Sequence, residues 1–156
     1  MQHILLRHLL ATIAYRLTKA LDGVDQTFLG FEVTQGTRSP YEIIHHMAHV
    51  VSYAISVIEQ KTVDVPIKLG EEEEVVRFYE LLKVADAVMV SYEIPLNIEQ
   101  KLVQGPLSDV LTHIGQISML RRLHGSPLAK ENFMKAQIEV GNVSRESQQL
   151  ASESDH

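Results

Sequence analysis

The chain has 156 residues, with 14 Lys and Arg against 20 Asp and Glu, so its formal net charge is −6. Apolar residues make up 45 % of the chain and charged residues 22 %, which are proportions of a globular protein and exclude global disorder. Cysteine is absent, which excludes a disulfide framework, a thiolate metal site and a cysteine nucleophile. The acidic charge argues against a nucleic-acid partner, because binding to phosphates needs a basic face.

The N-terminal segment does not have the pattern of a targeting signal. Arg7 and His8 interrupt its apolar residues, whereas a secretory signal needs an unbroken apolar run of about 7–15 residues. No stretch approaches the roughly 20 apolar residues of a membrane span. We therefore expect a cytoplasmic protein without a membrane partner.

The first predicted helix covers residues 2–21. Its apolar residues recur at steps of three and four, which is the spacing of one face of an amphipathic helix. The residues of this face are Leu5, Leu6, Leu9, Leu10, Ile13, Leu17 and Leu21. Asp22 and Gly23 end the helix, and a loop follows over residues 24–38.

The second predicted helix has the clearest start in the chain. The sequence Ser39-Pro40-Tyr41-Glu42 is a capping box, with Ser39 at the N-cap, Pro40 at the first helical position and Glu42 reaching back. From this start the helix is expected to continue to about Gln60.

The remaining helices are predicted from their termini. The third, residues 71–92, begins with four glutamates that complement the positive end of the helix dipole, and we interpret them as a solvated helix start. The fourth runs from Gly105-Pro106 to His124. A short fifth helix is expected over residues 129–139.

Together these elements predict an all-α fold, a four-helix bundle with a short fifth helix and a flexible C-terminal tail. We expect one domain over residues 1–141. Residues 142–156 are rich in Ser, Glu and Gln, and we expect them to form a disordered tail. Because facing helices of a bundle can assemble a metal site, polar residues near apolar helix faces are the candidates for function.

Three histidines lie close together in the second helix, where each residue turns by about 100° around the axis. His46 shares a stripe with Val50 and Val57, on the margin of the apolar arc. His45 is expected to point to water. His49 lies one turn after His46 and further toward water.

Asp109 and His113 are four residues apart in the fourth helix, so they share one face. Together with His46 from a facing helix, they would form a set of two imidazoles and one carboxylate. Such a set suits Zn²⁺, Ni²⁺ or Fe²⁺ and leaves positions open for water or substrate.

Each of these residues also has a purely structural interpretation. A histidine at the edge of a core face, such as His46, is usually a hydrogen-bonded structural residue. Asp109 lies near a helix start, where an acid is favoured by the dipole. Asp86, on the inner face of the third helix, is either an acceptor for a ligand imidazole or the partner of a Tyr or an Arg.

Two stretches resemble signatures of the DinB-like superfamily, the DNA-damage-inducible four-helix bundles. Residues 39–48, Ser-Pro-Tyr-Glu-Ile-Ile-His-His-Met-Ala, resemble its second-helix signature, in which a metal-binding histidine falls on His46. Residues 109–117 are similar to its fourth-helix motif of histidine, three residues, histidine and a Gly-Gln pair, and the second histidine falls on His113. The first histidine falls on Asp109, where this sequence departs from the motif.

The resemblance covers roughly residues 1–141 and implies a divalent metal held by His46, Asp109 and His113. His49 falls where relatives can carry an acid, which makes it a candidate fourth ligand or a base at the mouth of the site. Family members commonly pair, so the resemblance also implies a homodimer.

The family members with known chemistry, which are similar to bacillithiol- or mycothiol-dependent S-transferases and a maleylpyruvate isomerase, use the metal with a small thiol. This implies a metal-dependent transferase acting on a small-molecule substrate, or a hydrolase that uses metal-bound water. Since the chain has no cysteine, a thiol nucleophile would be an external low-molecular-weight thiol. The alternative is a non-catalytic, stress-related binding or scaffold bundle with a vestigial metal site.

Overall fold

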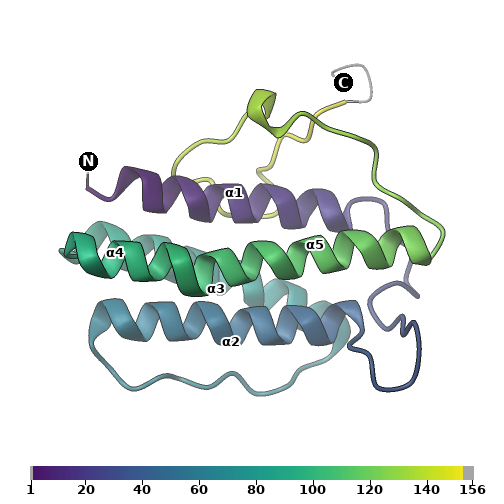
Figure 1. The fold of residues 1–156 in the computed structure, drawn as a ribbon, viewed down its shortest axis with the longest axis horizontal. Helices are drawn as coiled ribbons and strands as arrows, with labels where there is room; N and C mark the ends of the chain where they lie inside the picture. The colour runs from purple at the N-terminus through teal and green to yellow at the C-terminus, as the bar shows by residue number, and fades with distance from the viewer. Residues whose placement is uncertain (1, 153–156) are drawn as a thin grey trace.

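The structure, a computed structural model, describes residues 2–152, and every regular element in that range is helical. Four helical segments lie side by side as a bundle (Figure 1), which confirms the predicted all-α architecture. The fourth segment is continuous but is divided into two α-helices by a π turn. In chain order the elements are α1 (Ile4–Leu21), α2 (Pro40–Glu59), α3 (Glu71–Ser91), α4 (Leu96–Leu102), the π turn (Val103–Leu107), α5 (Ser108–Leu123) and a 3₁₀ turn (Phe133–Lys135).

The helices α1 and α5 run in one direction, and α2 and α3 run in the opposite direction (Figure 1). The connection over residues 60–70 therefore runs back along the length of α2 before α3 begins. Both α1 and α2 pack against α3 and α5. The contact between α2 and α5 is the one that positions the candidate site.

The apolar faces predicted from the sequence form the core of the bundle. Leu10, Ile13 and Leu17 of α1 and Ile44 and Met47 of α2 have no exposed surface. Full burial of one such side chain stabilises the fold by about 1.5–3 kcal/mol. These residues set the rotation of α2 about its axis, and thereby the direction of each histidine that it carries.

The predicted capping box at the start of α2 is confirmed. The backbone N–H and the hydroxyl of Ser39 both donate to Glu42 Oε1, over 3.2 and 2.9 Å, and Pro40 is the first helical residue. These bonds satisfy groups that a helix start leaves without helical partners. They fix the start of α2 about two turns before His46.

The predicted start of the fourth helix at Gly105-Pro106 is wrong, because the helical segment begins at Leu96. Pro106 lies inside the segment, within the π turn. There the N–H of Ser108 bonds to the carbonyl of Val103, five residues earlier. Proline has no N–H for a regular helical bond, and the wider turn accommodates it without ending the helix.

The predicted fifth helix over residues 129–139 is reduced to the single turn at Phe133–Lys135. Asn132 caps this turn by accepting a bond from the N–H of Met134 over 3.2 Å. Met134 is 94 % exposed, whereas the ring of Phe133 contacts Tyr15 and Arg16 of α1. A single turn suffices to make this contact.

Part of the predicted tail lies against the helices. Val143 is buried with the core, and the N–H of Ala151 donates to the hydroxyl of Tyr15 over 3.2 Å. The polar composition of this segment indicated disorder. Composition does not reveal that a single apolar residue, Val143, is buried and holds the segment against the helices. Residues 153–156 of that predicted tail lie outside the described residues. Within residues 2–152, no helix is both long and apolar enough to cross a membrane.

Candidate metal centre

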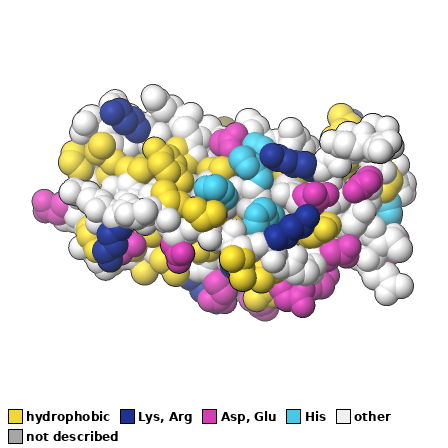
Figure 2. Space-filling model, turned by 90° about the horizontal axis from the view of Figure 1, so that it is seen from below, with side chains coloured by type: hydrophobic (Ala, Val, Ile, Leu, Met, Phe, Trp, Pro, Cys, Tyr) yellow, Lys and Arg dark blue, Asp and Glu magenta, His cyan; other side chains and the backbone are white. Residues whose placement is uncertain are grey.

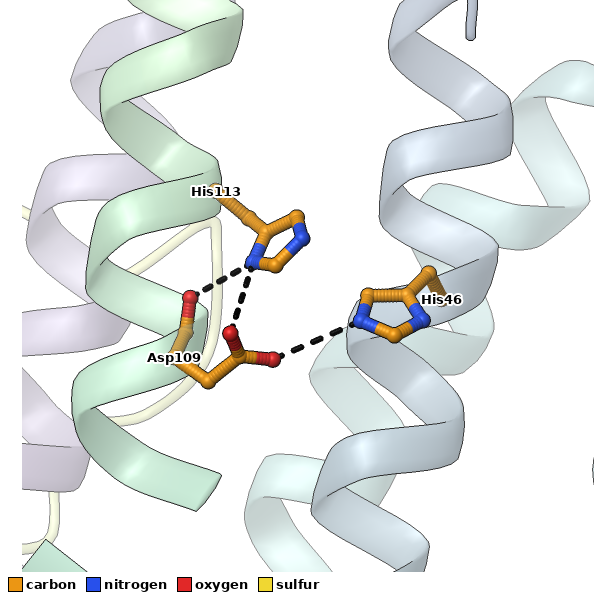
Figure 3. A group of neighbouring side chains, drawn as sticks. All are labelled: His46, Asp109 and His113. Atoms are coloured by element: carbon orange, nitrogen blue, oxygen red, sulfur yellow. Dashed lines mark hydrogen bonds and ion pairs between the residues drawn. The ribbon is translucent and has the colours of Figure 1, made fainter. Parts of the chain in front are cut away.

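The helices α2 and α5 bring His46, Asp109 and His113 together (Figure 3). One potential ligand atom from each residue lies within 4.8 Å of the other two. Between two of these atoms, His46 Nε2 and Asp109 Oδ2, the distance is 3.4 Å. Two ligands that each lie about 2.0–2.2 Å from a zinc ion are roughly 3–4 Å apart. The cluster could therefore hold a metal ion after small side-chain movements.

The backbone of α5 orients the imidazole of His113. Its Nδ1 lies 2.7 Å from the carbonyl oxygen of Asp109, one turn earlier in the helix. When Nδ1–H donates to this carbonyl, Nε2 carries the lone pair that can bind a metal. Such a bond to the second ring nitrogen is the usual way in which proteins fix a ligand histidine.

The surroundings of His46 favour its neutral form. Burial lowers the pKa of His46, and the neighbouring His113 lowers it further, while the hydrogen bond to Asp109 acts in the opposite direction. A metal binds the neutral imidazole, so a lowered pKa reduces competition from protons. The environment of His46 is therefore compatible with metal binding near neutral pH.

The three side chains are only partly covered by the protein. His46, Asp109 and His113 have side-chain exposures of 34 %, 42 % and 14 %. A structural metal site is usually closed, whereas a catalytic one keeps positions for water or substrate. The exposure of this cluster is that of an open site.

A cavity of about 720 Å³ adjoins the cluster. His46 and Asp109 line it, together with Val50 and Tyr53 of α2 and Pro106 of the π turn. A π turn inside an α-helix is often found at a functional site. Here the turn forms part of the wall next to Asp109.

His49 lies at the rim of the candidate centre. Its side chain is exposed and lines the cavity beside His46, but it is outside the group whose ligand atoms lie within 4.8 Å of one another. Its role as a fourth ligand stays a prediction. Its position at the mouth of the cavity also agrees with the alternative role of a base.

The prediction that His45 points to water is wrong. Its Nδ1 lies 2.6 Å from Glu74 Oε2, and Arg77 contacts both side chains. Burial and the charges of Arg77 and Lys68 lower the pKa of His45, so we assign it as a neutral donor to the carboxylate. The pattern of a single helix could not reveal this contact, because the partners come from α3.

Glu74 is likewise not part of a solvated helix start, since its side chain is fully buried. The other three glutamates of that turn are exposed, as predicted.

Asp86 accepts two bonds from the guanidinium of Arg7, over 2.8 and 3.0 Å. Of its two interpretations, the structure therefore supports the ion pair with an arginine.

Sequence reasoning missed two cations near His46. Arg38 and Lys68 line a second, smaller cavity beside His46 and His49. Arg38 precedes α2 and Lys68 lies in the connection between α2 and α3, more than twenty residues away in sequence. No helical period relates residues in two loops, so the sequence alone held no signal that they meet.

Comparison of the chain with protein-family models, with curated proteins and with solved structures found no match. Membership of the DinB-like superfamily, expected from residues 39–48 and 109–117, therefore stays a prediction.

Proposed function

We propose that the protein is a metal-dependent enzyme in which His46, Asp109 and His113 hold one divalent transition metal ion. The observation that carries the proposal is the convergence of these three partly exposed side chains from two helices, beside a cavity of about 720 Å³. Two imidazoles and one carboxylate suit Zn²⁺, Ni²⁺ or Fe²⁺. The resemblance to the DinB-like superfamily supports the same three positions, with Asp109 in place of a histidine.

The proposed reaction is the transfer of a small thiol to a small-molecule substrate, and hydrolysis is the alternative. A divalent metal held by His46, Asp109 and His113 would lower the pKa of a bound thiol or water and so would supply a nucleophile at neutral pH. Because the chain has no cysteine, the thiol comes from a low-molecular-weight cofactor. His49, exposed at the mouth of the cavity, is placed to accept the proton that the nucleophile or the substrate releases.

Metal stoichiometry separates this proposal from a non-catalytic scaffold bundle with a vestigial site. Elemental analysis of the purified wild type should find close to one transition metal ion per chain. The double variant His46→Ala with His113→Ala should hold none. A control that also removes two histidines, His8→Ala with His124→Ala, should keep full occupancy. Full occupancy in the first double variant would exclude the assigned ligands.

Activity is tested on the metal-loaded protein with a small thiol and 1-chloro-2,4-dinitrobenzene, whose aromatic carbon forms the C–S bond as chloride leaves. We expect conjugation that stops when a chelator removes the metal. His49→Ala should lower kcat while the Kd for the metal changes little. Hydrolysis of ester substrates, without any conjugation, would favour the alternative reaction.

We further propose that the chain forms a homodimer through apolar side chains of α1 and α3. Exposed apolar residues lie on both helices: Ile4, Leu5, Val76, Val84 and Val90. Scattered exposed residues are normal, but several on neighbouring helices can supply a contact between two copies. Light scattering at micromolar concentration should give twice the mass of the chain, and a monomer mass would contradict the proposal.

A further inference from the structure

A second cavity, of about 290 Å³, lies against the candidate metal centre. It is lined by Arg38, Glu42, His45, His46, His49 and Lys68. On the face seen in Figure 2, histidine side chains gather near the middle with Lys or Arg side chains beside them. Two cations thus meet three imidazoles and one acid on a chain whose formal net charge is −6.

Arg38 has no anionic partner of its own in the part of the chain that is described. None of the ion pairs among residues 2–152 involves Arg38, and its side chain is exposed toward the cavity that it lines. Its positive charge also contributes to the lowered pKa of His46. A guanidinium that faces a cavity without a carboxylate partner can form a bidentate pair with an incoming anion.

Lys68 is only loosely held by the protein. Its Nζ lies 3.7 Å from Glu42 Oε2 and 5.5 Å from the centre of the Tyr41 ring, and the side chain is 58 % exposed. The other oxygen of Glu42 accepts the bonds of the capping box from Ser39. With Arg38 and Lys68 positive and Glu42 negative, these three side chains carry a net charge of about +1.

The larger cavity at His46 exposes more apolar than polar surface. Val50, Tyr53 and Pro106 contribute to its wall. His46 and His49 line both cavities, so the two spaces meet at these histidines. A ligand that spans them would place an apolar body on one side of the metal centre and an anionic group on the other.

We propose that the site binds a small organic anion, with its carboxylate or phosphate between Arg38 and Lys68 and its apolar body over Val50 and Tyr53. This inference rests on the proposed function, because it names the substrate class of that site. Arg38 supplies a planar pair of donors and Lys68 a point charge. Neither residue belongs to the metal cluster, so their contribution can be separated from metal binding.

Isothermal titration calorimetry at neutral pH tests the proposal with three probes that share an aromatic ring. Benzoate carries a carboxylate, phenyl phosphate carries a phosphate, and benzyl alcohol is neutral. The zinc-loaded and the metal-free full chain are each titrated. We expect at least one anion to bind the zinc-loaded chain at least tenfold more tightly than benzyl alcohol, and the tighter of the two anions identifies the preferred group.

Arg38→Gln and Lys68→Gln should each weaken anion binding by about tenfold, as expected for the loss of a charge-assisted hydrogen bond. The matched control is Lys61→Gln. Lys61 lies in the same connection, has a 67 % exposed side chain and lines neither cavity, so anion affinity should change less than about twofold. The Kd for zinc should stay within about twofold in all three variants, because none removes a proposed metal ligand.

Equal binding of benzyl alcohol and the anions, or unchanged anion affinity in the Arg38→Gln and Lys68→Gln double variant, would overturn the proposal. A chain that binds no metal would refute the proposed function separately. In that case, the anion site would still be supported if the metal-free wild type binds an anion and the metal-free Arg38→Gln and Lys68→Gln double variant does not. If neither form of the protein binds benzoate or phenyl phosphate, the anion site is refuted, and metal occupancy decides the proposed function by itself.

Discussion

His45 and His46 are neighbours on α2, yet they belong to clusters of opposite character. His45 joins Glu74 and Arg77 in what we name the closed cluster, in which the carboxylate is fully buried and both partners contact it. His46 joins Asp109 and His113 in the open cluster. Its carboxylate lies 3.4 Å from a nitrogen of each imidazole and is 42 % exposed.

The closed cluster already contains its counter-charge, because Arg77 neutralises Glu74 and His45 adds a hydrogen bond. In the open cluster, the contacts of the Asp109 side chain are longer than the roughly 2.7–3.2 Å of a good hydrogen bond. Two imidazoles and a carboxylate there would all gain from one shared cation. Within residues 2–152, Arg77 Nε is buried without a hydrogen-bond partner, so the contrast lies in the two carboxylates. The comparison teaches that close pairing of the neighbouring carboxylate, more than residue type, separates a structural histidine from a candidate ligand.

The largest expected effect comes from breaking the closed cluster. Glu74→Ala leaves Arg77 and His45 facing each other with no carboxylate between them, and a buried charge without its partner typically costs about 3–5 kcal/mol. We expect a loss of this size in the free energy of unfolding, measured by urea denaturation. Metal affinity should stay within about twofold.

The control is Glu72→Ala in the same turn, whose side chain is exposed and whose loss should cost less than about 0.5 kcal/mol. A loss below about 1 kcal/mol for Glu74→Ala would show that the closed cluster contributes no more than a surface ion pair.

Breaking the open cluster should change metal affinity instead of stability. Asp109→Ala removes one proposed ligand, so we expect the Kd for zinc to rise by at least about 100-fold, because even the loss of an outer partner of a ligand costs about 10–100-fold. Asp109→His, which introduces the first histidine of the fourth-helix family motif, should keep the Kd within about tenfold. Competition with a chelator measures both values, and an unchanged Kd for Asp109→Ala would remove this residue from the centre.

His45 and His49, which flank His46 on α2, test whether the closed and the open cluster are independent. His45→Ala removes one hydrogen-bond partner of buried Glu74 and should cost about 1–3 kcal/mol of unfolding free energy, with little change in metal affinity. His49→Ala should cost less than about 0.5 kcal/mol, because the side chain is exposed. We also expect it to change metal affinity little. If His45→Ala weakens metal binding as much as His46→Ala, the division into two clusters fails.

The smallest expected effect concerns the start of α2, which positions both clusters. The hydrogen bonds from Ser39 lower the pKa of Glu42 below its ordinary value of 4.5. The folded state therefore gains stability from ionised Glu42 above pH 4.5, and this gain is lost as the pH falls through the lowered pKa. Glu42→Gln should lose less stability than the wild type on acidification below pH 4.5, measured by thermal unfolding at several pH values.

Much of the fold could be predicted because apolar spacing and helix termini are local features. The spacing of leucines in α1 and the capping box of α2 predicted helices whose first and last residues lie within two positions of those observed. The start of the fourth segment could not be predicted from Pro106, because proline is common both at helix starts and inside widened turns. Leu102 and Leu107, five positions apart and on either side of Pro106, are both buried, so the helical segment packs on the core before and after the proline.

The candidate site was predictable only in part, for a different reason. Asp109 and His113 share a helix, so their spacing placed them on one face. Their meeting with His46 was predicted from the place of His46 at the margin of an apolar face in a bundle, and the resemblance to a family supported it. The partners of His45 could not be predicted, because Glu74 becomes buried only when α3 packs on α2. Arg38 and Lys68 meet through loops that have no periodic pattern.

The π turn at Val103–Leu107 sets the angular phase between α4 and α5. It contains one residue more than a regular helical path would need, and deleting a residue there would rotate all of α5 by about 100° relative to α4. Val110 and Ile114 would then turn out of the core, and Asp109 and His113 would turn with them. The same rotation of α5 buries its apolar face and directs Asp109 and His113 toward the candidate metal centre. The length of this turn is therefore constrained both by packing and by chemistry.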